Sequence, residues 1–225
     1  MPARSATTGG AVSHIDSNPR GLPPTRACCY AWAMPPLVLA STSPYRRALL
    51  ERLRLPFEAV APGVDEDAVK QRGGDPRAVV EELARQKAHA VQARRPDAIV
   101  IGSDQAGVLD GRVLDKPGTE ANARAQLAAL RGKRHQLVTA VAIAHPGGTL
   151  GFTDVTTLSM RALSEAEIAR YVAAERPLDC AGSYKIEALG VSLFDRVESD
   201  DHSAIVGLPL LRLSQELRAL GMLVP

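Results

Sequence analysis

The chain has 225 residues, 45% of them hydrophobic, which suffices for one enzyme-sized unit with a single core or a core split into two lobes. A formal net charge of +2, with no basic stripe carrying interleaved aromatic residues, argues against a general nucleic-acid binder, so an anionic ligand would need a local site. The three cysteines and the histidines lack ligand spacing, which argues against a disulfide framework or a zinc site and indicates a reducing compartment.

Residues 1–33 differ in composition from the rest, since Gly and Pro interrupt any periodicity and Asp16 is the only acid. We expect a disordered extension there, followed by one domain over residues 34–225. The apolar run at residues 27–33 is followed at once by two prolines, which argues against a secretion signal. A transit peptide fits the acid-poor composition, and an extended gene start fits the position of Met34 equally well. No apolar run approaches the length of a membrane span.

The most informative stretch is residues 37–53, where a short apolar strand enters a helix through a hydroxyl-rich turn. Ser43 is a good N-cap, and Pro44 suits the first helical position. A helix start offers unpaired N–H groups and the positive end of the helix dipole, so this turn predicts an anion site. The two arginines of the turn could instead form a solvated helix face. The groups that could hold the anion are the hydroxyls of Ser41, Thr42 and Ser43 and the guanidinium groups of Arg46 and Arg47.

The middle of the chain alternates extended and helical patterns. Residues 56–64 read as an extended segment that ends in an acidic loop, and a helix begins at Pro76, capped by Asp75, and runs to about Arg94. Lys87 falls on the apolar stripe of that helix. A buried strand at residues 98–101 stops at residues 102–105, and residues 107–114 form a hairpin around Asp110 and Gly111.

The rest of the chain predicts further strands and helices, and hence a mixed, twisted α/β sheet with helices on its faces. Ser164 and Glu167 form a capping box. Gly221 is a stop signal after the last helix. The predicted elements are helices at residues 119–132, 164–175 and 209–220 and strands at residues 137–144, 149–160 and 189–194.

Four residues could take part in chemistry. Asp104 stands at the predicted carboxyl end of a buried strand, where open α/β sheets bind ligands, although a solvated turn aspartate is the default. Glu66 follows Asp65 in an acidic pair that could hold a divalent cation or be surface charge. Lys87, on a buried stripe, must snorkel or reach a buried anion. Lys116, before a proline, could be aimed into a cleft or be an ordinary surface lysine.

Taken together, these segments resemble the Maf family of nucleotide pyrophosphatases from residue 37 to nearly the C-terminus. The order and spacing of the motifs make the resemblance specific. They are LASTSPYRR at residues 39–47, VDE at 64–66, Lys87, IGSDQ at 101–105, DKP at 115–117, CAGSYKIEALG at 180–190 and VGLP at 206–209.

The resemblance implies a two-lobed fold around an active-site cleft, a divalent cation (Mg²⁺ or Mn²⁺), a possible homodimer and a cytoplasmic location. The low net charge and the lack of a long apolar run predict no nucleic-acid or membrane partner. It also implies cleavage of a nucleoside triphosphate to the monophosphate and pyrophosphate. Asp104 matches the family's proton acceptor. Glu66 and Asp104 would hold the metal. Catalysis would involve Asp104, Glu66, Lys87 and Lys116, and phosphate binding would involve Ser41, Ser43, Arg46 and Arg47.

Positions that select a branch of the family are Tyr45, Gln105 and Glu187, with Lys185 in the same segment as Glu187. The branch acting on thymidine and uridine triphosphates typically carries Arg, Thr and Gln at the first three, so the pattern here resembles the 7-methyl-GTP pyrophosphatase branch. A carboxylate at Glu187 can accept from the guanine edge, and Tyr45 can stack on a cationic methylated ring. A dTTP/UTP-type pyrophosphatase remains the alternative within the family.

Two other functions remain as alternatives. A nucleotide-sensing regulator of cell division would bind without turnover, but the intact set of Asp104, Glu66, Lys87 and Lys116 favours an enzyme. An inosine triphosphate pyrophosphatase of similar architecture is disfavoured by the STSPYRR turn and the IGSDQ segment.

Overall fold

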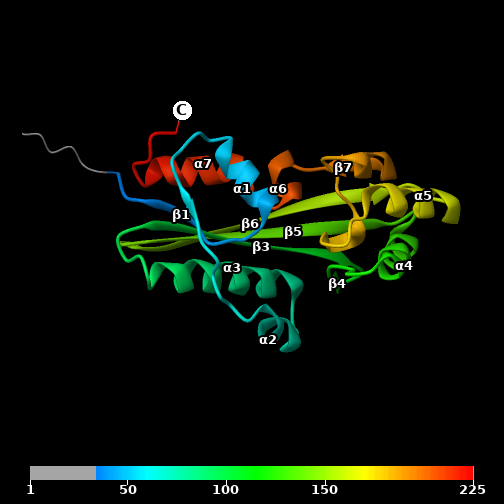
Figure 1. The fold of residues 1–225 in the computed structure, drawn as a ribbon, viewed down its shortest axis with the longest axis horizontal. Coiled ribbons are helices and arrows are strands. Elements are labelled where there is room, and N and C mark those ends of the chain that lie inside the picture. The colour runs from blue at the N-terminus through cyan, green and yellow to red at the C-terminus, as the bar shows by residue number, and fades with distance from the viewer. Residues whose placement is uncertain (1–33, 225) are drawn as a thin grey trace, which may run out of the picture. The chain divides into compact units, whose positions relative to one another are not determined.

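The structure is a computed structural model that describes residues 34–224, so the disordered extension predicted for residues 1–33 lies outside the described residues. Within residues 34–224, seven strands form one mixed sheet in the order β2-β1-β3-β5-β6-β7, and β4 pairs with β3 beside this path. Helices lie on both faces of the sheet (Figure 1). The predicted mixed α/β class is therefore confirmed.

The strands are β1 (Leu37–Leu39), β2 (Glu58–Ala59), β3 (Ile99–Leu109), β4 (Arg112–Leu114), β5 (Arg134–His145), β6 (Gly148–Met160) and β7 (Phe194–Glu198). The helices are α1 (Pro44–Glu51), α2 (Glu66–Gln71), α3 (Pro76–Gln92), α4 (Glu120–Leu130), α5 (Glu165–Glu175), α6 (His202–Val206) and α7 (Leu210–Ala219), with short 3-10 helices η1 (Ala181–Ser183) and η2 (Leu189–Leu193).

The strand β3 is longer than the sequence predicts. The predicted strand stops at Gly102, whereas β3 continues to Leu109, because residues 100–108 pair antiparallel with β5 along their whole length. Gly102 does not break the strand. It lets α3 lie close against it, since a Cβ there would overlap the carbonyl oxygen of Ala84 and the amide of Ala88. Asp104 consequently lies inside a strand, opposite Ala140 of β5, and the prediction that it stands at a strand end is wrong.

The other edge of β3 is interrupted. The parallel strand β1 pairs only with residues 99–101, and β4 pairs only with residues 107–109. Between them, residues 102–106 have no strand partner on that edge. The chain leaves β1 at this gap and turns into α1, so the turn predicted to bind an anion lies beside the open edge of the central strand.

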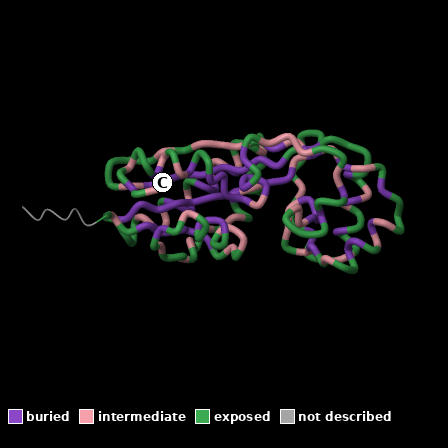
Figure 2. The backbone as a smooth tube through the Cα atoms, turned by 90° about the horizontal axis from the view of Figure 1, so that it is seen from above, coloured by how far each residue is buried: buried purple, intermediate pink, exposed green. Residues whose placement is uncertain are grey.

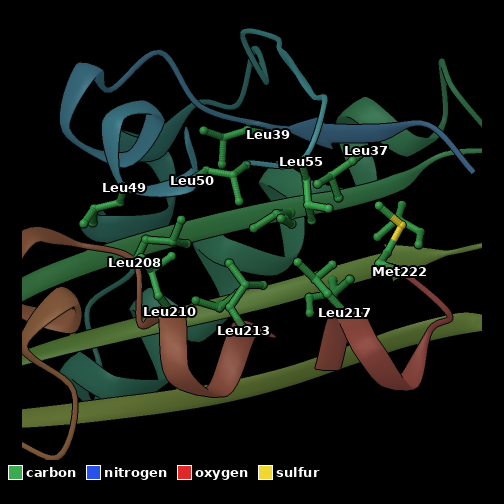
Figure 3. Packing of buried hydrophobic residues seen from close by; sticks show 14 residues of the cluster. Leu37, Leu39, Leu49, Leu50, Leu55, Leu208, Leu210, Leu213, Leu217 and Met222 are labelled. Atoms are coloured by element: carbon green, nitrogen blue, oxygen red, sulfur yellow. The ribbon is translucent and has the colours of Figure 1, made fainter. Parts of the chain in front are cut away.

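Side chains alternate between the two faces of β5. Val141 and Ile143 belong to an apolar cluster with residues of α1 and α7, while Ala140 and Ala142 pack with residues of α3 on the other face. Figure 3 shows leucines of α1 and α7 in the first of these clusters, among them Leu50 and Leu213. A second large cluster gathers residues of α4 and α5 around Leu137 and other strand residues. Figure 2 shows that the buried stretches concentrate in the strands and that the outer helices and loops are more exposed. These two large clusters lie within the one compact unit that the described residues form.

Local signals predict most element boundaries correctly. Ser43 caps α1 and accepts from the Arg46 amide, Ser164 and Glu167 form the complete capping box of α5, and the β3–β4 hairpin turns at Asp110 and Gly111. No helix within residues 34–224 is both long and apolar enough to cross a bilayer.

Three local predictions differ from the structure. Residues 189–193 form η2 rather than a strand, and the strand β7 follows at Phe194. The short helices α2 and α6 were not predicted, although Asp65 and Asp201 cap them. Glu66 is therefore the first residue of a helix and not part of a loop. Helices this short depend on tertiary packing more than on an apolar period, which leaves little pattern in the sequence.

Candidate active site

A cavity of about 410 Å³ lies along the open edge of β3, a size in the usual range for small-molecule sites. Its wall comes from the β1–α1 turn, α2, the start of α3, the segment after β4 and residues 179–187. Residues of both large apolar clusters contribute to the wall, among them Leu137 and Val206. The cavity therefore lies where the two apolar clusters adjoin.

The β1–α1 turn presents its hydroxyl groups and one arginine to this cavity. Ser41 Oγ accepts from the Ser43 amide at 3.1 Å, and Ser43 Oγ accepts from the Arg46 amide at 3.4 Å. Arg46 Nε donates to the carbonyl of Gly207 at 3.0 Å, and this hydrogen bond to a residue 161 positions further along the chain anchors the guanidinium. Burial lowers the pKa of Arg46 below its ordinary value. The negative charges of Asp104 and Glu66 raise the pKa and offset part of this effect.

Arg47, which the sequence groups with these residues, does not line the cavity. Its side chain is exposed, and Nε lies 3.1 Å from Glu51 Oε1 one turn along α1. The structure therefore separates the two arginines of the motif, and the alternative of a solvated helix face describes the position of Arg47.

The centre of the site is one buried lysine between two carboxylates. Lys87 Nζ lies 2.7 Å from Asp104 Oδ1 and 2.8 Å from Glu66 Oε1. The side chains of Lys87 and Asp104 are 5% and 9% exposed, whereas that of Glu66 is 40% exposed. The helical period of α3 put Lys87 on the buried stripe, and the close approach of α3 to Gly102 brings it to Asp104.

Opposing effects set the pKa of Glu66. Burial raises it, but the hydrogen bond and charge of Lys87 and the charges of Lys70 and Lys116 together hold the pKa below its ordinary value. Glu66 is therefore a carboxylate at neutral pH. With Asp104 it offers oxygen ligands of the kind that Mg²⁺ takes from proteins when substrate phosphates complete its shell.

A cage made of protein ligands alone is absent, since residues 34–224 contain no group of three or more His, Cys, Asp or Glu side chains placed to hold a metal. The two carboxylates of Glu66 and Asp104 both face the cavity. This donor set suits a hard divalent cation that is shared with a phosphorylated ligand and would not suit a permanently bound structural metal.

Two further lysines line the same cavity. Lys116 is exposed on the segment after β4, as predicted. Lys70, which the sequence analysis did not single out, lies on α2, and its Nζ is 3.5 Å from Asp115 Oδ1. The sequence signal that could have identified Lys70 is its spacing of four residues from Glu66, but this requires knowing that residues 66–71 are helical.

Another part of the wall holds the residues predicted to select the base. Tyr45 and Glu187 both line the cavity. The Tyr45 hydroxyl donates to Asp179 Oδ2 at 3.3 Å, and burial, with the charges of Cys180 and Asp179, raises the pKa of Tyr45. Lys185 does not line the cavity; its Nζ lies 3.8 Å from Asp179 Oδ1.

Gln105 also lines the cavity, but its amide nitrogen is already used within the protein. Gln105 Nε2 donates at 2.8 to 3.0 Å to Thr139 Oγ1 and to the carbonyl oxygens of Ala204 and Ile205. These bonds connect β3 to β5 and α6. Gln105 therefore has a structural role that the sequence comparison of branches does not reveal. Among residues 34–224, no protein group donates a hydrogen bond to its Oε1.

Tyr184 is a buried wall residue that the sequence analysis did not name. Its hydroxyl lies 2.9 Å from His135 Nε2, and the two rings meet edge to face. Burial lowers the pKa of His135 to about 4, so the imidazole is neutral at physiological pH. His135 therefore has a structural role beneath the cavity, as expected when the sequence assigned it no chemistry.

Comparison with known proteins adds to this geometry. A family model described as Maf-like protein matches residues 36–220. A 7-methyl-GTP pyrophosphatase from Xanthomonas axonopodis pv. citri is 52% identical over 192 residues, which cover 85% of this chain and 100% of that protein. Proteins of the same name from Alkalilimnicola ehrlichii and Aromatoleum aromaticum are 55% and 51% identical, covering 83% and 84% of this chain and 94% and 97% of their own lengths.

Among solved structures, the chain is similar to a protein described as nucleoside-triphosphatase / dITP/XTP pyrophosphatase from Mycobacterium abscessus. The TM-score is 0.42 and the sequence identity 18%, over 84% of this chain and 97% of that one. A similarity of this degree carries no argument about activity.

Proposed function

The chain belongs to the Maf family, and on that premise we propose that it is a nucleoside triphosphate pyrophosphatase that releases a nucleoside monophosphate and pyrophosphate. The observation that carries the proposal is the contact of Lys87 with both Asp104 and Glu66, in a cavity whose wall also includes the anion-binding turn of α1. A water-activating carboxylate and a phosphate site then lie within one small-molecule cavity.

In the proposed reaction, Asp104 accepts a proton from a water molecule whose oxygen attacks the α-phosphorus. The new P–O bond forms as the bond to the bridging oxygen breaks, and pyrophosphate leaves. Lys87 orients the Asp104 carboxylate through the 2.7 Å contact. Arg46 and Lys116 would neutralise the charge that develops on the leaving group.

We further propose that Glu66 and Asp104 hold a divalent cation, Mg²⁺ or Mn²⁺, together with the phosphates. When bound, the ion would neutralise charge on the phosphate oxygens. Chelation with EDTA should abolish turnover, and added Mg²⁺ or Mn²⁺ should restore it. Full activity after extensive chelation would reject the metal.

For the base, we propose 7-methyl-GTP. The relatives that carry this name are about half identical to the chain over nearly their whole lengths. Tyr45 presents an aromatic ring to the cavity, and Glu187 presents a carboxylate that makes no hydrogen bond or ion pair with any residue of the described range 34–224. An aromatic face and a carboxylate suit a cationic purine whose N–H groups are donors.

A cytoplasmic location and a homodimer follow from the family resemblance and remain part of the proposal. Nothing in the cavity calls for a nucleic-acid or membrane partner, and a small nucleotide fits its size.

The test is a panel of canonical and methylated nucleoside triphosphates assayed for pyrophosphate release with Mg²⁺ or Mn²⁺. We expect pyrophosphate and the monophosphate, with the highest kcat/KM for 7-methyl-GTP. Orthophosphate and a diphosphate would refute the mechanism, and a preference for dTTP or UTP would refute the base assignment. Tight binding without any turnover would instead support a nucleotide-sensing regulator.

A further inference from the structure

We infer that Lys70 binds the phosphates that leave as pyrophosphate, exchanging its present partner Asp115 for them when a nucleotide enters the cavity. The inference rests on the proposed function, because it adds a binding residue to the same site. It assigns a role to a residue outside the motifs that carry the family resemblance.

Lys70 shares a helix face with a proposed catalytic residue. It lies four residues after Glu66 in α2, so both side chains share one face of the helix, and both line the cavity. Val69, between them, is buried and holds the helix against the protein.

The other cations of the cavity are largely engaged within the protein. A nucleoside triphosphate brings several negative charges, whereas Lys87 is committed to Glu66 and Asp104. Arg46 already donates Nε to the Gly207 carbonyl, which leaves only its terminal nitrogens for a ligand. Of the other cations predicted from the sequence, Lys116 lines the cavity, whereas Arg47 turns away to Glu51. An additional ammonium on the cavity wall is therefore chemically useful, and Lys70 is placed to supply it.

The present ion pair of Lys70 with Asp115 is weak. Lys70 Nζ lies 3.5 Å from Asp115 Oδ1, longer than the 2.7 and 2.8 Å contacts of Lys87. The side chains of Lys70 and Asp115 are 38% and 67% exposed. Exposed ion pairs contribute little to stability, so this one can be exchanged at small cost. A phosphate oxygen is a charge-assisted acceptor of at least equal strength.

Asp104 lies next to the reacting phosphorus in the proposed mechanism, and Glu66 contacts the same lysine, Lys87. Lys70 lies one helical turn beyond Glu66 along α2, and it contacts Asp115, the neighbour of Lys116, which the proposed mechanism assigns to the leaving group. We therefore assign to Lys70 the phosphates beyond the cleaved bond. Lys70 should therefore affect the binding of triphosphate and of inorganic pyrophosphate, but not the binding of the monophosphate product.

The experiment compares Lys70→Ala with Lys133→Ala. Lys133 is a matched control because it is also an exposed lysine with one aspartate partner, Asp110 at 4.0 Å, and it does not line the cavity. For Lys70→Ala we expect KM for the triphosphate and the inhibition constant of inorganic pyrophosphate to rise about tenfold, with kcat within about twofold. Inhibition by the monophosphate should not change, and Lys133→Ala should match the wild type in every respect.

Asp115→Asn tests the exchange itself and should act in the opposite direction, with tighter pyrophosphate binding, because Lys70 then has no competing carboxylate. The inference is overturned if Lys70→Ala leaves pyrophosphate inhibition at the level of Lys133→Ala, or weakens monophosphate binding equally. Weaker pyrophosphate binding by Asp115→Asn would overturn the exchange.

The two proposals can fail separately. A wild-type protein that releases pyrophosphate from no triphosphate would refute the proposed function. Calorimetric binding of inorganic pyrophosphate would still decide the role of Lys70, since weaker binding by Lys70→Ala than by Lys133→Ala supports it and equal binding overturns it.

Discussion

Replacing Asp104 with Asn separates the chemistry of this residue from its structural role. Asp104 Oδ1 accepts from Lys87 Nζ at 2.7 Å, and its side chain is 9% exposed, inside β3. Asn has the same size and keeps an oxygen that can accept from Lys87, but it cannot take a proton from water. The substitution therefore removes basicity while leaving the contact with Lys87 in place.

The structure sets the expected magnitudes. Loss of a proton acceptor should lower kcat by about two to four orders of magnitude, equivalent to about 3 to 5 kcal/mol of transition-state stabilisation. The cost in folding stability should be about 1 to 3 kcal/mol, since Lys87 keeps an ionic contact with Glu66 at 2.8 Å. The thermal midpoint should then fall by no more than about 12 °C for a chain of this size. Nucleotide binding should persist, because a negative charge is removed from an anion site.

The assay is pyrophosphate release under single-turnover conditions, with nucleotide binding measured separately by calorimetry. Asp110→Asn is the control, because Asp110 lies in the exposed β3–β4 turn with φ near 51°, a conformation that Asn also adopts well. A kcat for Asp104→Asn within tenfold of the wild type would place the proton acceptor elsewhere. Loss of nucleotide binding together with loss of turnover would show that Asp104 acts in binding.

Three further outcomes are expected. Glu187→Gln should cost at least one charge-assisted hydrogen bond to a guanine edge, lowering kcat/KM for 7-methyl-GTP by about 10- to 150-fold while UTP suffers less; an equal loss for both nucleotides would refute the specificity role. Gln105→Thr should lower the free energy of unfolding, measured in urea, because Thr is too short to keep all three hydrogen bonds to β5 and α6. A change of base preference is therefore better attempted at Tyr45 and Glu187 alone. The free energy of unfolding should fall as the pH drops from about 6.5 toward 4, because the pKa of His135 is about 4 in the folded state and only the unfolded state binds the proton in that window. The loss reaches about 3 kcal/mol. In urea unfolding measured at several pH values, His135→Phe should reduce this pH dependence.

The sequence alone was sufficient where the deciding interactions are local. The caps of α1 and α5 and the β3–β4 turn depend on hydrogen bonds or backbone angles within four residues, and residue types such as Ser43, Ser164 and Gly111 indicate them directly. The burial of Lys87 follows from the 3.6-residue period of α3, which the sequence also shows. The motifs of the family, compared by order and spacing, predicted the fold class and the family correctly.

Only the tertiary structure could decide which of these residues meet. Asp104 lies within a strand because a distant segment, β5, extends β3 past Gly102, and Lys87 reaches it because α3 packs directly on that glycine. Arg47 carries the same charge as Arg46, yet it turns outward to Glu51, which the motif cannot show. Lys70 joins the cavity through a short helix without a clear apolar period. Such contacts depend on how separate segments pack against one another, and residue type and local spacing do not encode that geometry.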